Sequence, residues 1–139
     1  MAEVTATWQR EDLLMTAEND SGNAIVLDSS EAVGGKNRGP RPLQLMLMSL
    51  AGCTSMDVIS ILQKKREPLQ DFQVIVRAEQ ADSHPKVFTK IHIEYVVTGD
   101  VKEASLQRAI ELSEQVYCPA QAMLRPAAEI TSSYRIIRP

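Results

Sequence analysis

The sequence predicts an α+β fold, and three observations support this class. Short segments of alternating apolar and polar residues, typical of strands, occupy the first 28 residues and recur from Phe72 to Val97. Between these two groups lies a long apolar segment that begins at Pro42 and has the length of a helix. Strands and helices are therefore grouped along the chain, which is the pattern of an α+β protein.

The N-terminal part is predicted to form three short strands and a connector. The strands cover about Val4–Gln9, Leu13–Ala17 and Ala24–Asp28, with a turn of polar residues and glycine at 19–23. The connector, Gly34–Pro42, is rich in glycine and proline, and Pro42 suits the first turn of a helix.

A helix is expected over about Pro42 to Arg66, and it would be roughly 36 Å long, about the diameter of a small domain. It is apolar on nearly every side, so we expect it to be buried all round. A chain of 139 residues can hardly enclose such a helix alone. We therefore infer an obligate homodimer that shares it. A monomer in which the sheet and a second helix cover it is the alternative.

The C-terminal part is predicted to hold two longer strands, two helices and a last strand. The strands, 72–81 and 87–97, are joined by a hairpin connection. Gly99 and Asp100 begin the next helix, where Asp100 and Glu103 resemble a capping box. A short helix over 119–124 and a strand over 129–137 follow. The order is βββ-α-ββ-α-α-β in a single domain, residues 1–139.

Composition narrows the possible functions. The net charge is −3 and the only basic run is Lys64–Arg66, so no nucleic-acid partner is expected. The N-terminus carries an early acid and no apolar segment, which indicates no secretion signal. The longest apolar stretch, Leu43–Ala51, is too short to span a bilayer. We expect a cytoplasmic protein with no membrane partner.

The two cysteines are the main candidates for chemistry. In a reducing cytoplasm, a pair of cysteines more often does transient redox work than forms a structural disulfide, although each could simply pack as a small hydrophobe. Cys53 lies in the long helix beside Gly52, where small residues leave room next to the thiol. A reactive thiolate there needs a cation. Periodicity does not choose among the candidates, which are Arg10, Arg38, Arg41 and Arg125.

Cys118 has a different setting, since it directly precedes Pro119, the expected first residue of a helix. Its sulfur should lie near free backbone N–H groups and the positive end of a helix dipole, which would stabilise its thiolate.

Other polar residues give weaker signals. His92 is interpreted as a solvent-facing strand residue, and Asp57, four residues after Cys53, as polar structure or a dimer contact, because a carboxylate there opposes thiolate formation. The histidines and cysteines lack the CxxC and HxxxH spacings of zinc sites, so no metal is expected. No phosphate loop or flavin or nicotinamide fingerprint is present, so no cofactor is expected either.

Three segments resemble the OsmC/Ohr family of osmotically inducible and organic hydroperoxide resistance proteins: Gly39–Leu45, Leu50–Val58 and Val116–Leu124. The resemblance implies an OsmC-like fold, with a curved antiparallel sheet and a long central helix in an intertwined homodimer. It also implies a thiol-dependent peroxidase. In that enzyme Cys53 would be the peroxidatic thiol, Cys118 the resolving thiol, and Arg10 the best match to the activating arginine.

The implied reaction passes through a Cys53 sulfenic acid and a Cys53–Cys118 disulfide, which an outside dithiol such as a lipoyl protein or thioredoxin reduces. An apolar pocket would favour organic hydroperoxides. One feature departs from the family pattern: its active peroxidases carry a glutamate just after the helix-starting proline, where this chain has Leu43 and Gln44. Glutamine can hydrogen-bond an arginine but not neutralise it. This favours a second hypothesis, a non-enzymatic dimer that binds a small hydrophobic ligand or senses redox state.

Overall fold

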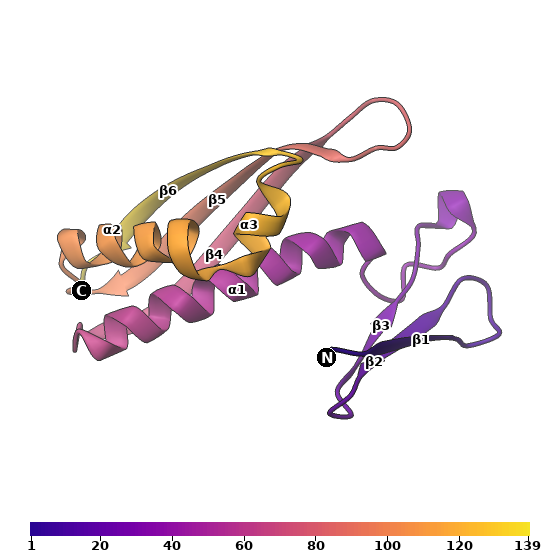
Figure 1. The fold of residues 1–139 in the computed structure, drawn as a ribbon, viewed down its shortest axis with the longest axis horizontal. Helices are drawn as coiled ribbons and strands as arrows, with labels where there is room; N and C mark the ends of the chain where they lie inside the picture. Colours follow the sequence, from indigo (N-terminus) through magenta and orange to yellow (C-terminus); the bar gives the residue numbers. More distant parts are fainter. The chain divides into compact units, whose positions relative to one another are not determined.

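The structure is a computed structural model that describes residues 1–139. Its elements follow the predicted order, with a short 3-10 helix and a π-helix in addition (Figure 1). Their bounds are β1 Val4–Trp8, β2 Met15–Asn19, β3 Ala24–Leu27, η1 Glu31–Val33, α1 Pro42–Lys64, β4 Leu69–Gln80, β5 Phe88–Gly99, α2 Glu103–Leu112, η2 Ser113–Tyr117, α3 Pro119–Leu124 and β6 Glu129–Ile137. The predicted α+β class is confirmed.

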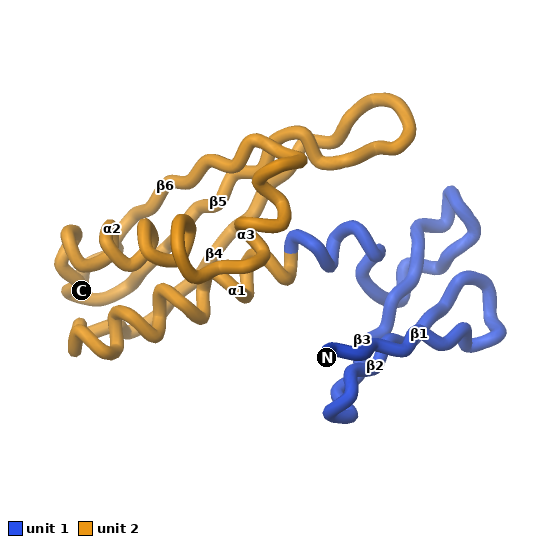
Figure 2. The backbone as a smooth tube through the Cα atoms, in the orientation of Figure 1, with its two compact units in different colours: residues 1–47 blue, residues 48–139 orange.

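The chain divides into two compact units, residues 1–47 and 48–139 (Figure 2). Helix α1 begins in the first unit and continues in the second. The single domain over residues 1–139 stays a prediction.

The first unit contains an antiparallel sheet in the order β1-β2-β3. The β2–β3 turn is built by Asn19, whose side-chain oxygen accepts hydrogen bonds from the backbone N–H groups of Ser21 and Asn23 at 3.0 and 2.8 Å. Gly22 follows with φ of +83°, a conformation that glycine adopts without strain. The polar turn expected at 19–23 is thus confirmed.

The second unit contains a sheet in the order β4-β5-β6, in which β5 pairs antiparallel with β4 and parallel with β6. The strands therefore form two three-stranded sheets, and β6 differs from the expected antiparallel arrangement. The physical reason is the connection: the chain crosses back through α2, η2 and α3 before β6 begins, so β6 runs in the direction of β5.

The core of this unit lies between the sheet and α1 and α2, which cover one of its faces (Figure 1). Along β5, Ile91, Ile93, Tyr95 and Val97 are almost completely buried. His92 alternates with them and therefore points to the other face, as predicted.

Helix α1 buries a narrower face than the sequence suggested. Its buried residues, Leu50, Thr54, Val58 and Leu62, recur every four positions and form one stripe. On other sides Met56 is 73% exposed in this single chain. The expectation of burial all round is therefore not met within one chain.

By length and composition, α1 is also apolar enough to cross a membrane, which corrects the expectation drawn from Leu43–Ala51 alone. Core helices of soluble proteins meet the same criterion. The prediction that the protein has no membrane partner stays a prediction.

Helix α2 begins later than expected, at Glu103 rather than near Asp100. The predicted capping box is wrong: Asp100 pairs instead with Arg138 at 2.8 Å. The start of the helix is held by Glu67, whose carboxylate accepts hydrogen bonds from the backbone N–H of Lys102 and the hydroxyl of Ser105, at 3.2 and 2.7 Å. A cap supplied from so far along the chain has no local signal.

Candidate functional site

The two cysteines lie side by side in the second unit. Cys53 is on α1, Cys118 immediately precedes α3, and the thiol of Cys118 donates a hydrogen bond to Cys53 Sγ over 3.0 Å. Both thiols are free; Cys118 is buried and Cys53 is half-buried. A disulfide bond is about 2.05 Å long, so a small shift would be enough to join the sulfurs.

The backbone before Cys118 explains its position. Helix α2 widens into the π-helix η2, in which the N–H of Cys118 bonds to the carbonyl of Ser113 over 2.8 Å. Pro119 then begins α3 as predicted, and Cys118 Sγ accepts a hydrogen bond from the N–H of Gln121 at 3.4 Å. Cys118 is thus held through both its backbone N–H and its sulfur.

The expected thiolate at Cys118 is wrong. Burial, followed by its hydrogen bond to Cys53, raises the pKa of its thiol to about 11, and the N–H of Gln121 offsets only part of this rise. Cys118 is therefore a protonated thiol at neutral pH. It is the donor in the sulfur pair, and Cys53 is the acceptor. The half-buried cysteine is the better nucleophile and the buried one the better resolving thiol.

A chain of hydroxyl groups lies beneath the cysteines and was missed by the sequence analysis. Thr54 Oγ1 is 2.8 Å from Tyr95 Oη and 2.9 Å from Ser113 Oγ, and Ser113 donates to Asp57 Oδ2 at 2.9 Å. Thr54, Ser113 and Tyr95 are fully buried. Only Asp57 carried a signal, because it lies one turn after Cys53 on α1.

Asp57 completes a cluster with the cysteines. One of its carboxylate oxygens and the two sulfurs all lie within 4.8 Å of one another. Two thiols and a carboxylate are groups that bind zinc, so these are the residues that could hold a metal ion. The expectation of no metal stays a prediction.

A cleft of about 500 Å³ opens at Asp57. Its walls combine apolar side chains with the cation of Lys64, and the lining residues are Asp57, Ser60, Ile61, Lys64, Leu112 and Tyr117. The cleft gives solvent and small molecules a route to the acid beside the thiols. Next to Cys53, a Cβ built on Gly52 would meet no atom within 4 Å, so the room predicted there is present.

The candidate arginines have different settings. Arg10 is exposed in the turn after β1, with φ of +62°, and belongs to the first unit. Arg38, in the same unit, pairs with Asp28 at 2.9 Å and also with Glu11 and Asp12. In the second unit, Arg125 donates to the backbone carbonyl of Glu114. The assignment of Arg10 as the activating residue stays a prediction.

The ion pair with Asp28 holds the Arg38 side chain at the connector between β3 and α1. Burial alone would raise the pKa of this carboxyl, but the Arg38 side chain and the N–H groups of Ser29, Arg38 and Lys36 hold it far below its usual range. The side chain of Gln44 also has a partner. Its oxygen accepts a hydrogen bond from the backbone N–H of Arg41 at 3.0 Å, at the start of α1.

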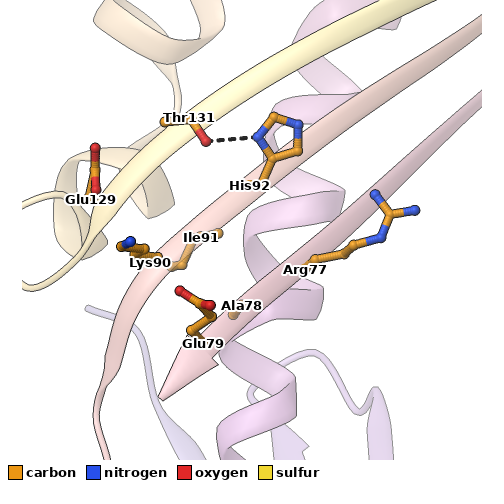
Figure 3. Close-up of a pocket in the computed structure, with 8 residues that line it drawn as sticks. All are labelled: Arg77, Ala78, Glu79, Lys90, Ile91, His92, Glu129 and Thr131. Atoms are coloured by element: carbon orange, nitrogen blue, oxygen red, sulfur yellow. Dashed lines mark hydrogen bonds between the residues drawn. The ribbon is translucent and has the colours of Figure 1, made fainter. Parts of the chain in front are cut away.

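A second hollow lies on the far face of the β4-β5-β6 sheet and is separate from the cysteines (Figure 3). It measures about 270 Å³, and His92 on its wall bonds through both ring nitrogens, to Thr131 and Ser133, at 2.7 and 2.9 Å. With both nitrogens engaged, His92 is a structural strand residue here.

Comparison with known proteins identifies the family. A model of the family described as OsmC-like protein matches residues 35–133. The chain belongs to this family. The matched range contains both cysteines and Asp57, whereas Arg10 lies outside it.

Relatives support this membership along nearly the whole chain. The chain is 37% identical to protein YhfA of Escherichia coli K12 over 128 residues, 91% of this chain and 92% of YhfA. It is similar to a solved hypothetical protein of Aquifex aeolicus, with 29% identity, a TM-score of 0.87 and 100% and 98% of the two chains covered. It shares its fold with the organic hydroperoxide resistance protein OsmC of Legionella pneumophila, at 17% identity, a TM-score of 0.71 and 96% of each chain covered.

Proposed function

We propose that this OsmC-like protein is a thiol-dependent peroxidase that reduces organic hydroperoxides in the cytoplasm. The observation that carries the proposal is the pair of free thiols 3.0 Å apart, one half-buried and one buried and protonated. That asymmetry suits a two-cysteine mechanism, in which one thiol attacks and the other resolves. The name of the Legionella relative supports hydroperoxides as the substrate class.

The reaction has three steps. The Cys53 thiolate attacks a peroxide oxygen, the O–O bond breaks, and the alkoxide takes up a proton and leaves as an alcohol, which converts Cys53 to a sulfenic acid. The Cys118 thiol attacks the sulfenic sulfur, which forms the disulfide and releases water. A dithiol, such as a lipoyl protein or a thioredoxin-like protein, then reduces the disulfide and is itself oxidised. Neither metal nor organic cofactor is required.

Two further features belong to the proposal. The apolar walls of the cleft at Asp57, which include Ile61 and Leu112, suit an organic peroxide better than hydrogen peroxide. A homodimer is proposed because Met46, Met48 and Met56 leave an apolar side of α1 exposed in the single chain. Arg10 would activate Cys53 in that assembly.

Mass spectrometry after one equivalent of cumene hydroperoxide tests the proposal. The wild-type protein should form the Cys53–Cys118 disulfide, and Cys53→Ser should consume no peroxide. Cys118→Ser should react once and then over-oxidise at Cys53, because no thiol captures the sulfenic acid. Wild-type protein that stays folded with both thiols free would overturn the proposal.

The second candidate function is a redox sensor or a ligand-binding dimer that oxidises without turnover. Gln44 favours it, because its side chain bonds to the backbone of Arg41 and supplies no acid to hold an arginine. Steady-state peroxide consumption with excess dithiol distinguishes the two. A peroxidase turns over many times, whereas a sensor consumes one equivalent of peroxide and stops.

A further inference from the structure

Asp57 has no role in the three steps above, although its carboxylate lies in the cysteine cluster. A carboxylate oxygen of Asp57 lies within 4.8 Å of both sulfurs, and a carboxylate gives an attacking thiolate no electrostatic help because both are anions. An acid in that place works against the first step of the reaction. A chemical role for Asp57 therefore belongs to a later step of the reaction.

The hydroxyl chain beneath the cluster has a fixed direction. Ser113 donates its single hydroxyl proton to Asp57 Oδ2, so its oxygen must accept a hydrogen bond from Thr54. Thr54 therefore has no proton left for Tyr95, and Tyr95 must donate to Thr54. Every O–H dipole in the chain therefore points its positive end toward Asp57. Such aligned dipoles stabilise a carboxylate and polarise one another in a buried setting.

The hydroxyl chain ends inside the protein, at the buried side chain of Tyr95. Burial raises the pKa of Tyr95 well above its ordinary value, so this hydroxyl keeps its proton and acts as a donor. The hydroxyl chain therefore does not conduct protons to solvent, and its hydrogen bond from Ser113 holds Oδ2 of Asp57 in place. The other carboxylate oxygen of Asp57 takes no part in the hydroxyl chain, and Asp57 lines the cleft.

We propose that Asp57 is the proton acceptor for Cys118 in the resolving step; this rests on the proposed function. As Cys118 Sγ bonds to the sulfenic sulfur of Cys53, Asp57 takes the proton of the Cys118 thiol, directly or through one water in the cleft. The S–O bond breaks, and the hydroxide that leaves receives this proton and departs as water. Asp57 ends as a carboxylate and no charge is gained or lost.

A buried thiol needs this help more than an exposed one. Cys118 holds its proton in the resting enzyme, where it donates to Cys53. It becomes a good nucleophile only when a base removes the proton during the attack. A general base typically contributes about 10²- to 10⁴-fold in rate.

Asp57→Asn tests the proposal, because asparagine keeps the size of the side chain and an oxygen for Ser113. The protein is oxidised with cumene hydroperoxide, quenched with dimedone at increasing times, and the sulfenic acid and disulfide are quantified by mass spectrometry. We expect sulfenic acid to form at Cys53 at the wild-type rate or faster, and the disulfide to form at least about 10²-fold more slowly. Asp57→Glu should restore much of the rate. The matched control is Asp100→Asn, which removes a carboxylate that is exposed and remote from the cluster.

A peroxide-free measurement separates this inference from the proposed function. Glutathione disulfide is used to load Cys53 as a mixed disulfide, and release of glutathione by Cys118 is followed. This step also needs the Cys118 proton removed, so Asp57→Asn should slow it similarly. If Asp57→Asn does not fold, Ser113→Ala replaces it as the test variant. It keeps the carboxylate of Asp57 but removes the hydrogen bond that holds it, and it should slow glutathione release by a smaller factor. Wild-type rates of disulfide formation and glutathione release in Asp57→Asn would overturn the proposal, whatever the peroxidase activity.

Discussion

In the redox site, burial determines the pKa of Cys118 more than its position at the start of a helix does. Cys118 has the helix N-terminal position that usually lowers a thiol pKa, and its sulfur accepts an N–H bond there. Burial outweighs this, and the pKa rises. The position of Cys118 was predictable from Pro119, but its burial depended on residues from other elements.

The raised pKa of Cys118 predicts a loss of stability at alkaline pH. The folded thiol titrates at about 11 and the ordinary value is 9.0. As pH rises past 9.0, the Cys118 thiol loses its proton in the unfolded chain but keeps it in the native state. The stabilisation from this group is therefore fully present below pH 9.0 and decreases as the pH approaches the folded pKa of about 11. We expect the free energy of unfolding of the reduced protein to fall above pH 9.0, by at most about 1.4 kcal/mol per pH unit for this group.

Urea denaturation in the presence of a reductant, at a series of pH values from 8 to about 10, measures this effect. Cys118→Ser is the control, since serine does not titrate. Tyr95 adds an alkaline loss in both proteins because its pKa is raised too. An identical pH dependence in the two proteins would show that Cys118 titrates normally.

Thr54→Val tests the buried hydroxyl chain. Valine has nearly the same shape but leaves the hydroxyl of Tyr95 without an acceptor and that of Ser113 without a donor. An unsatisfied buried polar group costs about 1–3 kcal/mol, so we expect a loss of this size in chemical denaturation. Tyr95→Phe removes only the terminal donor and should cost less. Equal losses in the two variants would argue against a directed chain.

At the scale of elements, the sequence predicted what local patterns determine. The bounds of α3 and β6 were predicted to the residue, because Pro119 and the alternation over 129–137 are local signals. The start of α2 was not, since Glu67 caps it from the connection between α1 and β4. The cysteine pair was expected from the family resemblance, whereas the Tyr95–Asp57 chain joins β5, α1 and η2 and has no signal in any one of them.

The buried stripe of α1 predicts which of its positions stabilise the second unit. Leu62 is fully buried, so Leu62→Ala should lower the free energy of unfolding by about 2–5 kcal/mol through lost burial and the cavity left behind. Lys64→Ala, at the end of the same helix, should change it by less than about 0.5 kcal/mol. Denaturant titration measures both. A small effect of Leu62→Ala would mean that the site collapses around the smaller side chain.

On the scale of the whole molecule, apolar side chains remain exposed in both units. Trp8 is 55% exposed in the first unit and Met56 is 73% exposed in the second. Along α1, Met46 and Met48 are exposed as well, and a contiguous apolar surface that stays exposed commonly marks an interface. The long helix therefore supports the homodimer inferred from the sequence, in which a partner chain would cover what one chain leaves open.

Light scattering coupled to size exclusion measures the assembly. We expect a mass twice the 15.4 kDa of the chain. Met56→Lys should shift the protein toward monomer, because it places a charge on the apolar side of α1. Glu111→Lys, an exposed change on α2, should leave the mass unchanged. A monomeric wild-type protein would contradict the prediction.

The π-helix η2 makes the chemistry depend on the width of a single helical turn. A π turn accommodates one residue more than an α turn, so it amounts to a single-residue insertion into α2. If the same residues continued α2 as regular α turns, Cys118 would lie about 100° further around the helix axis. The two sulfurs would then face different directions, although every functional side chain was still present.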